Sequence, residues 1–114
     1  MNPNNFQWYR GDSLPLLISF TNSDGTPTNI TGWTLFFTLK QFENDDDSLA
    51  LIQKTVTTHS NPTGGQSLIT IPSSSTGILG VFPYDVQYKD TAGLILTVVR
   101  GTIEFIQDIT VKSA

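Results

Sequence analysis

Apolar and polar residues alternate along much of the chain. Leu16, Ile18 and Phe20 share one face of residues 14–21, and positions 33, 35, 37 and 39 are apolar within residues 33–40. Alternation with a period of two predicts half-buried β-strands. Alternation also predicts a strand at 81–89, and β-branched residues predict one at 51–58. Further short strands are expected at 66–71, 95–99 and 103–106, about seven in all, with a single helical turn within 74–79.

Turn residues separate the predicted strands. Asp24-Gly25 before Pro27, the stretch 61–65, and Asp90 to Gly93 are strong turn signals. Short strands at this spacing predict an all-β, immunoglobulin-like Greek-key β-sandwich. At 114 residues the chain is expected to be a single domain spanning 1–114, with its core at about 8–110 and a polar N-terminal arm at 1–7.

Two features interrupt the strand pattern late in the chain. Pro83 has no backbone N–H, so its strand is expected to begin at Tyr84 or to run along a sheet edge. Arg100-Gly101 predicts a bulge or bend between 95–99 and 103–106, which allows these two segments to be one long bent strand.

Composition excludes several classes of function. The 6 basic and 10 acidic residues give a net charge of -4, too few cations for a nucleic-acid partner. The chain has no cysteine, which rules out disulfides, thiolate zinc sites and cysteine nucleophiles. It has no apolar run of the roughly 18 residues that a membrane span needs, and no apolar signal segment at Met1 to Asn5, so we expect a soluble protein without a membrane partner.

Candidate catalytic residues are few. His59 is the only histidine and has Ser60 beside it, but a triad also needs a held third partner and an oxyanion hole. We interpret His59 as an exposed loop residue and expect neither an enzyme nor a cofactor. A calcium site at Glu43, Asp45, Asp46 and Asp47 is the one metal alternative, although the EF-hand spacing is missing and a solvated acidic loop is favoured.

Two motifs could bind partners. Arg10-Gly11-Asp12 is an integrin-type tripeptide, but glycine at a bend before the first strand, with Asp12 accepting from backbone donors, explains it as structure. Trp8, Tyr9 and Trp33 could form an aromatic carbohydrate platform. Core packing of Trp33, and packing of Trp8 and Tyr9 across the end of the sandwich, is the favoured alternative.

The order of the motifs resembles a known family. Tyr9-Arg10-Gly11-Asp12 precedes an apolar strand, and Gly80 to Val86 comes late in the chain. This succession is similar to the N-terminal immunoglobulin-like domain of phage baseplate upper proteins and related tail proteins. Pro83 departs from that pattern. The residues that carry the resemblance are Arg10, Gly11, Asp12, Asp24, Gly25, Gly32, Trp33, Tyr84, Asp85, Gly93 and Gly101.

The resemblance implies a structural role. It suggests a non-catalytic phage or prophage virion protein, a tail or baseplate component that docks other tail proteins. Such a protein would be soluble in the host cytoplasm before assembly and would form a homo-oligomer in the virion. The alternative is a β-sandwich module that binds carbohydrate or a host surface.

Overall fold

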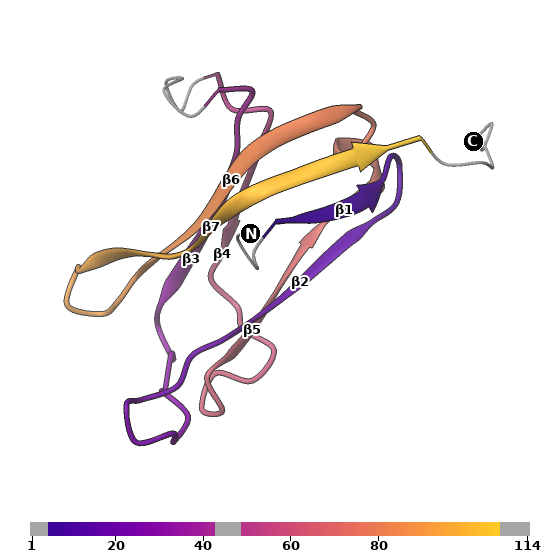
Figure 1. Cartoon of the computed structure of the whole chain (residues 1–114). Coiled ribbons are helices and arrows are strands. Elements are labelled where there is room, and N and C mark those ends of the chain that lie inside the picture. Colours follow the sequence, from indigo (N-terminus) through magenta and orange to yellow (C-terminus); the bar gives the residue numbers. More distant parts are fainter. Residues whose placement is uncertain (1–4, 43–48, 108–114) are drawn as a thin grey trace.

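The computed structural model describes residues 5–42 and 49–107, and the regular secondary structure in these ranges is almost wholly β-strand (Figure 1). No helix in these ranges has the length and apolar character needed to span a membrane. The predicted helical turn is the short 3-10 helix η2 (Ser73–Ser75). The strands are β1 (Phe6–Tyr9), β2 (Leu14–Ser19), β3 (Thr34–Leu39), β4 (Ile52–Val56), β5 (Gln66–Ile71), β6 (Gly80–Lys89) and β7 (Ile95–Ile106).

The strands form two sheets. One has five strands in the order β1-β7-β6-β3-β4, and the other pairs β2 with β5. The pair β2 and β5 lies across one face of the larger sheet (Figure 1). The expected all-β, sandwich-like fold is therefore confirmed, while the Greek-key connectivity stays a prediction.

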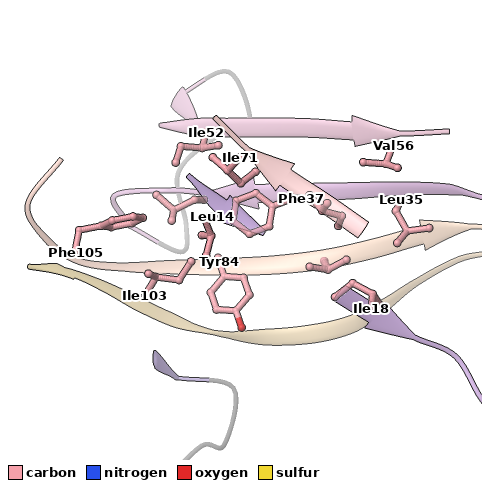
Figure 2. Packing of buried hydrophobic residues seen from close by; sticks show 13 residues of the cluster. Leu14, Ile18, Leu35, Phe37, Ile52, Val56, Ile71, Tyr84, Ile103 and Phe105 are labelled. Carbon is pink, nitrogen blue, oxygen red and sulfur yellow. The ribbon is translucent and has the colours of Figure 1, made fainter. Parts of the chain in front are cut away.

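The core lies between the two sheets. The alternation predicted for β3 is observed, because Leu35, Phe37 and Leu39 are buried. Side chains of both sheets meet there (Figure 2). Phe37 stacks on Tyr84 with ring centroids 5.7 Å apart. Burial raises the pKa of the Tyr84 phenol above its ordinary value. Other core residues are Leu14, Ile18, Ile52, Val56, Ile69, Ile71, Val86, Ile103 and Phe105.

β1 corrects the expectation of a polar arm at 1–7 for Phe6 and Gln7, which are part of this strand, whereas residues 1–4 lie outside the described ranges. Phe6 to Tyr9 pair in parallel with Ile103 to Ile106 of β7. The Thr102 amide extends this pairing by donating to Asn5 Oδ1 over 2.9 Å. Phe6 and Trp8 turn toward the core and are partly buried against it. A segment of four residues is too short to show a periodic pattern in the sequence. It forms a strand because β7 lies beside it as a hydrogen-bonding partner.

β6 corrects the expectation for Pro83. The strand begins at Gly80 and lies between β7 and β3, with Pro83 inside it. The Pro83 carbonyl accepts from the Lys40 amide over 3.0 Å, one residue after β3 ends. The backbone N and O of a strand residue point to the same neighbouring strand, so the N–H that Pro83 lacks would also have pointed to Lys40. Because Lys40 lies just beyond the end of β3, only the last hydrogen bond between β3 and β6 is lost.

β7 is one continuous strand, and its irregularity is not at Arg100-Gly101. The register shifts between Val86 and Gln87 of β6, opposite Val99 and Thr97, which leaves Val98 as the extra residue. Gly101 is buried and pairs with Tyr84 of β6. The structure therefore has seven strands, the number expected, but not the same seven. β1 was not predicted, and the last two predicted strands form the single strand β7.

Candidate functional site

Arg10-Gly11-Asp12 forms the turn that joins β1 to β2. Gly11 has a φ of 82°, the left-handed conformation that favours glycine. All three backbone amides donate, to Ile106 O, Thr76 O and Tyr9 O respectively. The tripeptide therefore follows the first strand instead of preceding it.

Asp12 contributes to this turn through its backbone. Its carbonyl accepts from Trp8 Nε1 over 3.2 Å and from Thr76 Oγ1 over 2.8 Å. Within the described residues no hydrogen bond to the Asp12 carboxylate is found, so the expected bonds from backbone donors to this side chain are not observed. The backbone of the turn is tied to β7 and to the residue after η2, which fits a structural role.

Two other motif aspartates hold turns through their side chains. Asp24 Oδ1 accepts from the Thr26 amide over 3.0 Å and from Thr26 Oγ1 over 2.6 Å. These bonds hold the pKa of the Asp24 carboxyl below its ordinary value. Asp90 Oδ1 accepts from the amides of Ala92 and Leu94, both over 2.9 Å. Gly25 and Gly93 each have a φ of 88° beside these aspartates.

Trp33 lies beside the core instead of within it. It is half-buried at the start of β3, after Gly32 with a φ of 83°. Its ring lies 4.6 Å from that of Tyr88 and 5.4 Å from that of Phe20. These three rings form an aromatic cluster at the end of the sandwich where β3 begins.

His59 is not the exposed loop residue that the sequence suggested. It is partly buried, and both ring nitrogens are bonded. Nε2 lies 2.8 Å from the Trp33 carbonyl, and Nδ1 lies 2.8 Å from Ser67 Oγ. The imidazole therefore connects the residue before β3 in one sheet to β5 in the other.

The direction of these bonds follows from their partners. A carbonyl oxygen only accepts, so Nε2 carries a proton, and in the neutral imidazole Nδ1 then accepts from the Ser67 hydroxyl. This pairs a serine with a histidine, as nucleophilic catalysis would require. However, the Ser67 side chain is fully buried, at 0% exposure, and a substrate cannot reach Oγ. The pair is a structural bridge between the sheets.

Replacing His59 with alanine is expected to lower the free energy of unfolding by about 2–3 kcal/mol, because it leaves the buried Ser67 hydroxyl and the Trp33 carbonyl without their partner. Urea denaturation followed by tryptophan fluorescence measures this. Ser67→Ala in the same background should recover part of the loss, since it removes the orphaned hydroxyl. Thr58→Ala, an exposed neighbour, is the control and should change stability by less than about 0.5 kcal/mol. An equal effect of Thr58→Ala and His59→Ala would contradict the bridge.

The aromatic platform is not formed. Trp8 and Tyr9 alternate on β1, so Trp8 turns inward while Tyr9 is 53% exposed on the other side. Trp8 lies opposite Phe105 of β7, whereas Trp33 packs on Tyr88, the partner of Leu96. These two points of β7 are nine residues apart, a span of ~30 Å, which is too far for one sugar-binding surface.

The calcium candidates Glu43, Asp45, Asp46 and Asp47 lie outside the described residues. Within 5–42 and 49–107, no three histidine or carboxylate side chains gather as a metal site would require. The outer face of the larger sheet carries an open depression of about 440 Å³ over β3, β6 and β7. Its polar lining includes Thr38, Lys40, Asp85, Gln87, Thr97 and Arg100.

Large apolar side chains are exposed at both ends of the five-stranded sheet. One set, which we call the sheet-end group, lies where β3 ends and β6 begins. At the other end the β6–β7 hairpin extends beyond β1, which covers β7 only from Ile103 to Ile106, and carries a set that we call the hairpin surface (Figure 1). The sheet-end group comprises Phe42, Leu49, Leu51, Leu79 and Val81, and the hairpin surface comprises Leu94, Ile95, Leu96 and Val98.

The hairpin surface has no counterpart among the sequence-based site predictions. A stretch such as Leu94 to Val99, which is apolar except for Thr97, is typical of a strand buried on both faces. No known protein family and no characterised protein matches this chain in sequence. Function must therefore be argued from its own surfaces.

Proposed function

We propose that this chain is a structural, non-catalytic component of a phage or prophage virion, a tail or baseplate protein that docks other tail proteins. The observation that carries the proposal is the exposure of large apolar side chains at two opposite ends of one sheet. Exposed apolar groups of this size mark protein-protein contacts more often than catalytic sites. A subunit with contacts at both ends is suited to a place between neighbours in an assembly.

The sheet-end group is the surface proposed for another tail protein. Phe42 is 63% exposed, Val81 is 58% exposed and Leu51 is 43% exposed. Hydrogen bonds place these residues at one end of the sheet, since the Leu51 amide donates to Leu39 O and the Lys40 amide donates to Pro83 O. The family resemblance supplies the identity of the assembly, and the apolar surface supplies the means of docking.

The test is the position of the protein in virus particles. Antibodies raised against the purified chain should label one end of the tail in phage particles released by the host strain, as seen by electron microscopy. In particles assembled from a Phe42→Ser/Val81→Ser variant the label should be lost, provided that the variant protein is folded. Purified particles without label would contradict the proposal.

The polar depression favours a second candidate function, the binding of carbohydrate or of a host surface. Its hydroxyl, amide and charged side chains resemble the groups that orient polar ligands. Here the site lies on the outer sheet face and not at Trp8 or Tyr9. A glycan array should then give hits that Gln87→Ala abolishes, and an array without hits would remove this candidate.

A further inference from the structure

We propose that the free edge of β7 at residues 94–98 pairs with the same edge of a second copy of this chain, about a two-fold axis at Leu96. β1 covers β7 only from Ile103 to Ile106. Among the described strands, the first half of β7 therefore has β6 on one side and no neighbour on the other. This inference does not depend on the proposed function.

The hydrogen-bonding groups of this edge can be assigned from the turn before it. The Leu94 carbonyl accepts from the Asp90 amide, so the backbone groups of Leu94 point toward β6. Successive strand residues alternate, so Leu96 also faces β6, while the backbone groups of Ile95 and Thr97 point to the free side. The free edge thus offers two N–H and two C=O groups.

The edge lacks the features that protect other strands from pairing. No charged residue or proline occurs from Leu94 to Val99, and Leu94, Ile95 and Leu96 are 53%, 54% and 48% exposed. Natural edge strands are usually guarded by charge, proline or shortness. β4 carries Lys54, β2 carries Pro15, and β1 has only four residues.

A second copy fits this edge in one register. With Leu96 opposite Leu96 in antiparallel pairing, Ile95 of each copy exchanges both backbone bonds with Thr97 of the other, which uses all four outward groups on each side. The two Leu96 side chains then meet directly. The same register brings Arg100 of each copy toward the Asp90–Gly93 turn of the other, so opposite charges lie near each other at both ends of the contact.

A single introduced cysteine tests this register, because the chain has none of its own. Directly opposed residues of a non-bonded antiparallel pair have Cα atoms ~4.5 Å apart, within the range that a disulfide spans. Leu96→Cys should therefore form a covalent dimer on mild oxidation, seen on a non-reducing gel. Leu94→Cys is the matched control, since it is about equally exposed but would lie ~13 Å from its copy, and it should stay monomeric.

Two further variants test the contact itself by sedimentation. The parent protein should show a concentration-dependent monomer-dimer equilibrium. Thr97→Pro removes an outward N–H, and Leu96→Arg places like charges opposite each other, so both should be monomeric with far-ultraviolet circular dichroism like the parent's. A parent that is monomeric at every concentration, or equal cross-linking of the Leu94→Cys and Leu96→Cys variants, would overturn the pairing and leave the proposed virion role standing.

Discussion

Replacing Gly65 with alanine is expected to lower the free energy of unfolding by about 3–5 kcal/mol, the sum of left-handed backbone strain and steric overlap. Gly65 has a φ of 73° and is buried between two chain segments. An added Cβ would overlap the carbonyl oxygen of Phe20 and would lie 2.8 Å from that of Thr28. Backbone atoms cannot move aside as a flexible side chain can, so the loop must separate from the end of β2.

Gly11→Ala is the matched control for this prediction. Gly11 also has a positive φ, but no atom of the described residues lies within 4 Å of its added Cβ. Only the left-handed strain remains, which costs about 1 kcal/mol. Urea denaturation of both variants, followed by fluorescence, measures the difference. Similar losses for the two glycines would contradict the close approach at Gly65.

The strands that lie on the core were predictable from alternation. β2, β3 and β5 fall within the predicted ranges because one face of each is buried, and burial on one face leaves a period of two in the sequence. β4 is buried only at its two ends, and its β-branched residues made it predictable. The turns at Asp24 and Asp90 were predictable for a different reason. Their hydrogen bonds join residues two to four positions apart, so the local sequence contains the whole interaction.

The remaining features depend on partners that are distant in the sequence. β1 exists because β7 lies beside it, 97 residues further along the chain. Pro83 can occupy a strand between two others because it lies opposite Lys40, just beyond the end of β3. His59 is hydrogen-bonded to Ser67, which is 8 positions away, and to Trp33, which is 26 positions away. The sequence around His59 contains no pattern that predicts either partner. These pairings are properties of the packed sheets.

The hairpin surface shows the same limit for the candidate site. Its mostly apolar stretch resembles a buried strand, whereas its exposure depends on β1, which is distant in the sequence and covers β7 only from Ile103 to Ile106. The exposed residues come from the first part of β7, while Ile103 and Phe105 in the second part are buried. One strand therefore serves both as a core element and as the edge proposed for pairing.

Phe37→Ala is expected to lower the free energy of unfolding by about 4 kcal/mol, since it empties the space of a buried aromatic ring. Phe37 is 1% exposed and stacks on Tyr84. The matched control is Phe36→Ala on the opposite face of β3, where the half-buried ring should contribute about 1 kcal/mol. Urea denaturation again measures both.

This pair of variants also tests the register of β3 against β4 and β6. A slip of β3 by one residue would exchange its two faces and would make Phe36 the buried ring. The order of the two losses would then reverse. The edge of β7 proposed for two-fold pairing is assigned from the turn between β6 and β7 and from their mutual register, so a reversed order would correct β3 and leave that pairing standing.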